Sequence, residues 1–234
     1  MTTRGSERKP WWPRLWGHVA YWFFWATLAQ FVRCYFRVAA KNAPRIKGPF
    51  VLVGNHVAFA DPIIVGCVLR RRIAYVMSAI YYRNPRFGWF CRGSGTIPMS
   101  VTGSNREGLR AMRETLQDGR VLGIFPEGGI SRDGLLQLGS PGAVASVLSE
   151  KVPVVPFAII GGSKATPSGG RWRWRKITVR FGDPIQPEAL MLAREASRKQ
   201  RLSFATHCIM DEIAALSGQI SRETQLQQLE AAQG

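Results

Sequence analysis

The sequence predicts an α/β fold: a mixed, largely parallel sheet flanked by helices and preceded by a membrane-associated aromatic helical segment. From Gly48 onward, short apolar runs alternate with stretches of helical spacing, which is typical of strands that alternate with helices. The chain has 234 residues, of which 46% are hydrophobic. This size suits one α/β domain with an appendage, whereas two full domains are not expected.

We expect four regions along the chain. Residues 1–14 are basic and rich in proline, and they form a flexible N-terminus. Residues 15–44 form the membrane-associated segment, and residues 45–220 form the α/β domain. Residues 221–234 form a C-terminal tail.

The membrane-associated segment contains no charged side chain over residues 15–32, which lie between Arg14 and Arg33. This length reaches the lower limit for a membrane-spanning helix. His18, Gln30 and the many aromatic residues favour a helix that is embedded in the interface without a full span. A signal peptide and a buried core helix are the alternatives, and no small-residue cleavage site supports the first.

Strands are predicted where apolar runs are short and continuous, in chain order at residues 49–53, 73–77, 121–125, 152–160 and 177–181. Helices are predicted between them where apolar residues recur every three or four positions or helix formers dominate, at residues 62–70, 105–118, 142–148 and 187–217. Leu109, Met112 and Leu116 show that spacing, and Gly119 closes their helix. The last range holds one helix or two.

The strong positive charge favours an anionic partner. Lys and Arg number 32 against 15 Asp and Glu, which gives a net charge of +17. Tryptophans alternate with basic residues at positions 9–14 and 171–176, as at a bilayer interface. Single-stranded nucleic acid and a solvated basic surface are alternatives. No nucleic-acid-binding signature occurs, so we expect an anionic membrane as the partner and no nucleic acid. The expected location is the cytoplasmic face of the inner membrane.

The four cysteines indicate neither a metal site nor a redox motif. They are scattered, with no CxxC pair and no grouping with histidine, at Cys34, Cys67, Cys91 and Cys208. We expect reduced thiols, no metal and no bound cofactor.

The first candidate site directly follows a predicted strand, where α/β folds place reactive groups. It comprises Asn55, His56 and Asp61. Histidine can accept a hydroxyl proton near neutral pH, and a carboxylate paired with it would hold its tautomer. Asp61 precedes Pro62 and is expected to cap a helix. A capping Asp beside an incidental His is the alternative from the residues alone.

The second candidate site follows another predicted strand. Pro126, Glu127, Gly128 and Gly129 form a tight turn that lets a ligand approach the backbone. Glu127 directly follows an apolar run, where an unpaired carboxylate would be costly.

Together these residues resemble the glycerolipid acyltransferase superfamily, the 1-acylglycerol-3-phosphate acyltransferase-like group. Its four motif blocks match in order and spacing at residues 55–61, 95–98, 125–128 and 152–156. The resemblance covers about 60% of the chain, residues 45–185. In motif texture it is closest to the 2-acylglycerophosphoethanolamine acyltransferase half of the bifunctional acyl-carrier-protein synthetase/acyltransferases.

The resemblance implies an O-acyltransferase of phospholipid biosynthesis. His56 would deprotonate the hydroxyl of a lysolipid acceptor, which attacks the thioester of acyl-CoA or acyl carrier protein, and Asp61 would support His56. Glu127 would help to position the acceptor, together with Asn55 and its loop neighbours. Pro156 would shape a substrate channel. Oxyanion donors are expected among the backbone amides at the helix N-terminus near Asp61.

Three departures from the family pattern concern the acceptor. The cations that bind a phosphomonoester in this group are replaced by Ser78, Val101 and Ile130. We therefore expect a lysophospholipid or related lysolipid whose phosphate is shielded or missing. The alternative acceptor is 1-acyl-sn-glycerol-3-phosphate, whose phosphate would then be bound by cations at shifted positions. These replacement cations are Arg83, Arg86, Arg92 and Arg106. A non-catalytic basic membrane-binding protein is the alternative of another class.

Overall fold

The computed structural model describes residue 23 and residues 26–69, 71–85, 88–100, 105–165, 173–191, 196–222 and 224–225. Its centre is a seven-stranded sheet in the order β1-β7-β6-β2-β5-β3-β4. Neighbouring strands are parallel except for the antiparallel pair β6 and β7. The predicted mixed, largely parallel sheet flanked by helices is confirmed.

The strands are short, and the central ones are fully buried because their sequences are continuously apolar. Their bounds are β1 Ala39–Lys41, β2 Phe50–Gly54, β3 Ile73–Ser78, β4 Ile97–Met99, β5 Val121–Ile124, β6 Val154–Ile160 and β7 Thr178–Phe181. The strands predicted from sequence agree within a few residues. The strands β1 and β4 were not predicted, since each has only three residues.

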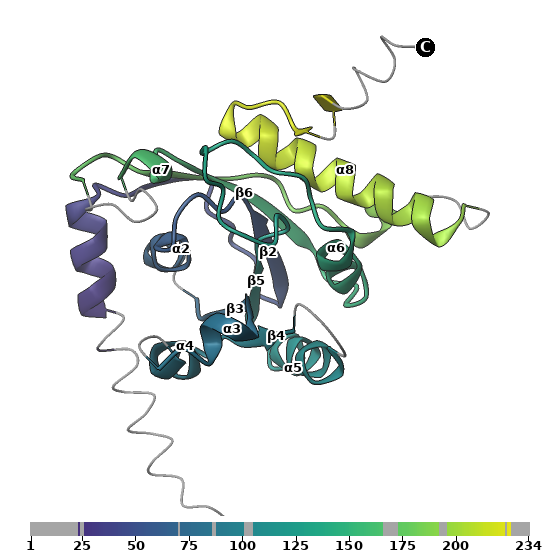
Figure 1. Cartoon of the computed structure of the whole chain (residues 1–234), viewed down its shortest axis with the longest axis horizontal. Helices are drawn as coiled ribbons and strands as arrows, with labels where there is room; N and C mark the ends of the chain where they lie inside the picture. The colour runs from purple at the N-terminus through teal and green to yellow at the C-terminus, as the bar shows by residue number, and fades with distance from the viewer. Residues whose placement is uncertain are drawn as a thin grey trace, which may run out of the picture.

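The helices cover both faces of the sheet. Their bounds are α2 Asp61–Val68, α3 Ala79–Tyr82, α4 Gly88–Ser94, α5 Arg106–Gln117, α6 Pro141–Leu148, α7 Gly162–Ala165 and α8 Arg198–Ser217, with a 3₁₀ turn η1 at Pro187–Leu190. Ser197 and Gln200 form a reciprocal capping box at the start of α8, and Gly218 ends it with a φ of +74°. Figure 1 shows α2 on one side of the sheet and α6 and α8 on the other.

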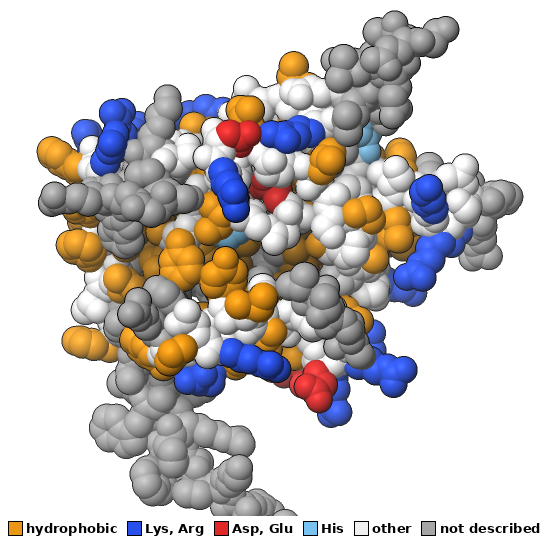
Figure 2. Space-filling view, viewed as in Figure 1, with side chains coloured by type: hydrophobic (Ala, Val, Ile, Leu, Met, Phe, Trp, Pro, Cys, Tyr) orange, Lys and Arg blue, Asp and Glu red, His pale blue; other side chains and the backbone are white. Residues whose placement is uncertain are grey.

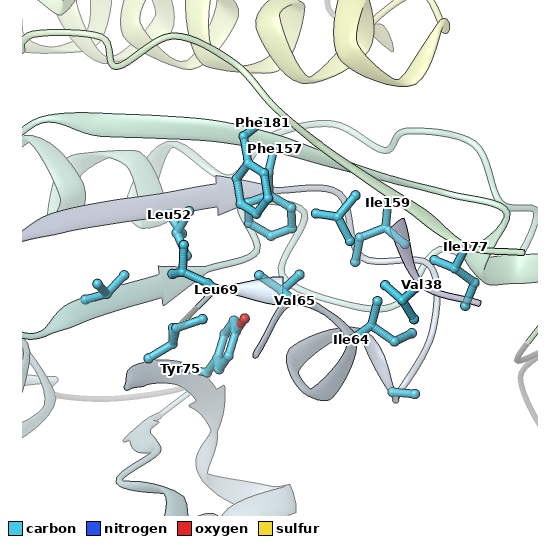
Figure 3. Close-up of a cluster of buried hydrophobic side chains, with 14 of the residues drawn as sticks. Val38, Leu52, Ile64, Val65, Leu69, Tyr75, Phe157, Ile159, Ile177 and Phe181 are labelled. Carbon is cyan, nitrogen blue, oxygen red and sulfur yellow. The ribbon is translucent and has the colours of Figure 1, made fainter. Parts of the chain in front are cut away.

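Two hydrophobic clusters hold these layers together. One contains Phe50, Leu52, Ile64, Val65 and Phe157, between the sheet and α2. Figure 3 shows this cluster, with the rings of Phe157 and Phe181 close together; their centroids lie 6.2 Å apart. The other cluster lies on the opposite face, where Val51 and Val53 meet apolar residues of α5, α6 and α8.

The N-terminal segment is only partly within the described residues. Residues 26–35 are helical, whereas residues 15–22 lie outside the described part. Val32 and Phe36 are buried in the cluster beside α2, and β1 pairs with β7. The sheet therefore begins before residue 45, the boundary expected from sequence. Within the described part of the chain, no helix combines the length and the apolarity needed to cross a membrane.

Candidate functional site

The loop after β2 brings His56 and Asp61 together. His56 Nδ1 lies 2.9 Å from Asp61 Oδ2, and the Asp61 side chain is fully buried while the histidine side chain is 17% exposed. An ionised carboxylate only accepts hydrogen bonds, so Nδ1 carries the proton in this pair. The lone pair of the neutral ring is then on Nε2, where it can accept a proton from a ligand.

Asp61 does not cap its helix, contrary to the sequence-based expectation. The N-cap of α2 is Ala60, and no side chain makes a cap hydrogen bond. Asp61 Oδ2 accepts instead from the backbone N–H groups of Val57 and Ala58, at 2.7 and 2.8 Å. The carboxylate thus folds the loop after His56 around itself. Burial raises the pKa of Asp61, and the hydrogen bonds from His56, Ala58 and Val57 oppose that rise.

At the start of α2, where oxyanion donors were expected, three backbone amides are already hydrogen-bonded. The N–H groups of Asp61, Ile63 and Ile64 already donate to backbone carbonyls of residues 58 and 60. Residue 62 is a proline and has no N–H. These three amides are therefore engaged in the fold of the loop and of the first helical turn.

An aromatic stack supports the histidine ring. Phe125 lies flat against His56, with ring centroids 4.1 Å apart and an interplanar angle of 15°. Tyr75 also stacks on Phe125, with ring centroids 5.6 Å apart and an interplanar angle of 6°. Phe125 and Tyr75 were not predicted as site residues. Phe125 directly precedes the Pro126–Glu127 pair, and this position was the available signal. Contacts of this kind fix the imidazole plane by packing.

Asn55 fastens the same loop to the neighbouring strand. Its side-chain amide donates to the carbonyl of Ile159, and its side-chain oxygen accepts from the N–H of Ile159, at 3.1 and 2.7 Å. Asn55 is 1% exposed. Both oxygen and nitrogen of its side chain are thus used to join β2 to β6, which positions His56 without contacting its ring.

Glu127 holds the main chain of His56. Its Oε1 accepts from the backbone N–H of His56 at 2.6 Å, and its Oε2 accepts from the N–H of Gln137 at 2.8 Å. Burial raises the pKa of Glu127 to about 7, against the two hydrogen bonds that lower it. Because both carboxylate oxygens bind backbone amides, Glu127 serves as a strut between two loops. Its contact with an acceptor stays a prediction.

The loop that contains Gly128 and Gly129 also holds the main chain of His56. The N–H of Ser131 donates to the carbonyl of His56 at 2.8 Å, so residues 127 and 131 hold both backbone polar groups of the histidine. Gly128 has a φ of +72°, which favours glycine, and a side chain at Gly129 would meet open space. Pro126 accepts from the N–H of Ser140 through its carbonyl.

Pro156 is not brought to this group. A Cβ at Gly182 would lie 2.9 Å from Pro156 Cγ and 3.2 Å from Leu216 Cδ1. The proline ring therefore lies on the α8 side of the sheet, whereas Phe157 packs on the α2 side. The sequence could not show which side of β6 each residue faces because the strand is apolar throughout.

Of the positions that replace the phosphate-binding cations, Ser78 and Ile130 lie within the described residues, and both side chains are uncharged. The Ser78 side chain caps α3 by accepting from Ile80 N–H, and Ile130 is half-buried. Val101 and Arg86 lie outside the described residues. The three other candidate cations, Arg83, Arg92 and Arg106, are exposed. Among the residues that the structure describes, no group of three or more His, Cys, Asp or Glu could hold a metal ion.

Comparisons with known proteins identify acyltransferases as relatives of this chain. A chloroplastic 1-acyl-sn-glycerol-3-phosphate acyltransferase of Brassica napus is 28% identical over 80% of this chain and 53% of its own length. A lyso-ornithine lipid O-acyltransferase of Pseudomonas aeruginosa is 31% identical over 50% of this chain and 45% of its own length. The chain thus spans about half the length of the curated relatives it matches.

The fold recurs in the crystal structure of the 1-acyl-sn-glycerophosphate acyltransferase of Thermotoga maritima, with a TM-score of 0.63 and 20% identity. That likeness covers 88% of this chain and 84% of the other. The family model described as Acyltransferase matches residues 35–160, more than half of the sequence, and this range includes His56, Asp61 and Glu127. The chain belongs to the acyltransferase family.

Proposed function

We propose that this protein transfers a fatty acyl group from acyl-CoA or acyl carrier protein to the hydroxyl of a lysolipid, with His56 as general base. The observation that carries the proposal is the 2.9 Å contact between His56 Nδ1 and the buried Asp61. Because Nδ1 is engaged, Nε2 is the nitrogen that faces the acceptor hydroxyl in the proposed reaction.

In the proposed reaction, the acceptor hydroxyl attacks the thioester directly, and the transfer passes through a tetrahedral intermediate. The hydroxyl proton passes to His56 Nε2 while the oxygen forms a bond to the thioester carbonyl carbon. The C–S bond then breaks, and the thiolate takes the proton back from the imidazolium. Asp61 stabilises the imidazolium and keeps its ring oriented. The loop contacts of Asn55 and Glu127 hold the histidine backbone in place, so little reorganisation is needed.

For the acceptor, we propose a lysophospholipid or related lysolipid with a shielded phosphate or none. Ser78 and Ile130 stand where related enzymes carry phosphate-binding cations, and neither can form an ion pair. The relative that acts on a lyso-ornithine lipid supports this class. We include in this proposal the resemblance in motif texture to the 2-acylglycerophosphoethanolamine acyltransferase half of the bifunctional acyl-carrier-protein synthetase/acyltransferases.

A second candidate acceptor is 1-acyl-sn-glycerol-3-phosphate. Two plant relatives whose names give this activity match 80% and 68% of the chain. Exposed arginines could then supply the phosphate contacts from shifted positions.

An acceptor panel separates the two. Purified protein is given labelled acyl-CoA or acyl carrier protein with lysophosphatidate, lysophosphatidylethanolamine, lysophosphatidylglycerol and lyso-ornithine lipid in turn. We expect a headgroup-bearing or phosphate-free acceptor to give the highest kcat/KM. A tenfold preference for lysophosphatidate would contradict the missing-cation argument and establish the second candidate.

We also propose that the protein works at an anionic membrane, on the cytoplasmic face of the inner membrane. The net charge of +17 and the aromatic segment at residues 15–32 support this. Sedimentation with anionic vesicles, partly reversed by salt, is the expected result. Equal binding to neutral vesicles would show that charge is not the attraction.

A further inference from the structure

Four large apolar side chains are exposed in the loop after β2 and in the helices α3 and α4. They are Phe59, Ile80, Tyr81 and Trp89, with exposed fractions of 50%, 72%, 56% and 61%. Ile80 and Tyr81 belong to α3, Trp89 belongs to α4, and these two helices are in contact. We call this surface the α3–α4 face. Figure 2 shows hydrophobic side chains gathered over α2, α3 and α4, with Lys and Arg side chains beside them.

The α3–α4 face adjoins the catalytic loop. Phe59 lies in the loop between His56 and Asp61. The helix α3 begins directly after the carboxyl end of β3, and β3 runs parallel to β5, which leads into the loop of Glu127. The exposed apolar side chains and the candidate site therefore share one edge of the sheet, the edge where parallel strands end.

The part of the chain that forms this face carries exposed charges of a single sign. From residue 8 to residue 106 the sequence contains one acidic residue, Asp61, and its side chain is fully buried against His56. The exposed charged residues that belong to α3 and α4 or directly follow them are Arg83 and Arg92. The surface thus combines aromatic and aliphatic side chains with cations and lacks exposed carboxylates among the described residues of this range.

We propose that the α3–α4 face docks onto an anionic lipid bilayer, so that an acceptor dissolved in the bilayer reaches His56 without crossing water. Aromatic rings and arginines together suit the headgroup region, where the rings bury apolar area and the cations meet lipid phosphates. Single exposed apolar residues are ordinary on soluble proteins, whereas a group of them with polar or charged neighbours marks an interaction site. The route of the acceptor rests on the proposed function, whereas the docking itself does not.

A soluble acidic partner, such as an acyl carrier protein, has charge chemistry that would also suit Arg83 and Arg92. The four exposed apolar side chains favour the bilayer, because amphipathic and aromatic side chains beside cations suit the headgroup region of a membrane. Binding of a carrier protein is therefore an outcome that the experiment must recognise.

The experiment compares the full chain with Ile80→Ser/Trp89→Ser and with the matched control Ile220→Ser. Ile220 is 59% exposed and follows α8, away from the α3–α4 face. Vesicles of phosphatidylglycerol and phosphatidylethanolamine are titrated, and the partition coefficient is measured by sedimentation. We expect the double variant to lose about tenfold in partition, since two apolar side chains no longer leave water, and the control to stay within about twofold.

Hydrogen exchange localises the contact independently of the N-terminal segment. Vesicles should slow amide exchange over Ala79–Tyr82 and Gly88–Ser94 and leave residues 218–222 unchanged. Unchanged exchange over both helices, or full vesicle binding by the double variant, overturns the docking proposal. The double variant could instead lose binding to the carrier protein and keep full vesicle partition. That result would overturn the docking proposal and identify the α3–α4 face as a protein-binding surface.

Activity separates this proposal from the proposed function. The double variant should keep wild-type turnover on a water-soluble short-chain lysolipid and lose about tenfold in kcat/KM on vesicles that contain the long-chain acceptor. A wild-type protein without acyl transfer, whose α3 and α4 are still protected by vesicles, would refute the proposed function and leave the docking in place.

Discussion

Replacing Asp61 by Asn tests the catalytic pair while it preserves the shape of the loop. Asp61 Oδ2 accepts three N–H bonds, from His56 Nδ1 and from two backbone amides. The other oxygen, Oδ1, is buried and accepts no hydrogen bond from the described residues. Asn can place its carbonyl oxygen at the Oδ2 position and its amide nitrogen at the Oδ1 position, so all three bonds persist with a neutral acceptor.

The stability change should be small. A hydrogen bond to a charged acceptor contributes about 1 kcal/mol more than one to a neutral acceptor, so three bonds lose about 3 kcal/mol. The buried carboxylate also carries a desolvation penalty of several kcal/mol, which Asn removes. We expect Asp61→Asn to change the free energy of unfolding by less than about 2 kcal/mol. Asp61→Ala leaves two backbone amides without their acceptor and should cost about 2–6 kcal/mol.

The catalytic change should be large. An amide cannot stabilise the imidazolium as a carboxylate does, and kcat should fall by about 10³–10⁴-fold with little change in KM. Initial rates of labelled acyl transfer at saturating acceptor measure this, and urea denaturation measures stability on the same samples. A folded Asp61→Asn variant whose kcat stays within threefold of wild type would refute the role of the pair.

Substitutions at three further positions test the supports of His56. Burial raises the pKa of Glu127 to about 7 from 4.5, so the folded state binds more protons than the unfolded chain between these values. Stability is therefore lost as pH rises through that window, on the order of 3 kcal/mol, and Glu127→Gln should remove this slope in denaturation at several pH values. Phe125→Leu should lower kcat about three- to tenfold, with Phe125→Tyr close to wild type in the same acyl-transfer assay. Asn55→Ala should destabilise the fold by about 2–4 kcal/mol in denaturation, because both polar backbone groups of Ile159 lose their buried partner.

Each of these has a contradicting result. An unchanged pH slope in Glu127→Gln would mean that the carboxyl titrates as in the unfolded chain. A Phe125→Leu variant that raises KM and leaves kcat intact would assign the ring to substrate binding instead. Wild-type stability in Asn55→Ala would mean that solvent satisfies Ile159.

Much of the fold could be predicted because its central elements are long or strongly patterned. The strand Phe50–Gly54 is entirely apolar, and the helix Arg106–Gln117 carries its apolar residues on one face. Short elements escaped prediction because three or four residues carry too little periodicity. The strand Ala39–Lys41 forms only by pairing with β7, and Ile97–Met99 contains a proline that is tolerated at the edge of the sheet.

The identity of the site residues could be predicted where the chemistry limits the residue type. Their hydrogen-bond partners could not be predicted, because these depend on how distant segments pack. The sequence indicated His56 and Asp61, and the structure places them 2.9 Å apart. It could not show that Asp61 turns back to the amides of the preceding loop instead of capping α2, because one carboxylate serves either arrangement. Nor could it show that Glu127 binds backbone amides of residues 56 and 137, which lie 71 and 10 positions away.

The most direct measurement of the central claim is acyl transfer by His56→Ala. The histidine side chain is partly exposed and makes one side-chain hydrogen bond, so the variant should fold, which circular dichroism and urea denaturation can verify. We predict that wild type transfers labelled acyl groups from acyl-CoA or acyl carrier protein to a lysolipid and that His56→Ala loses at least about 10³-fold in kcat. A folded His56→Ala variant with full turnover would contradict the assignment of His56 as the base.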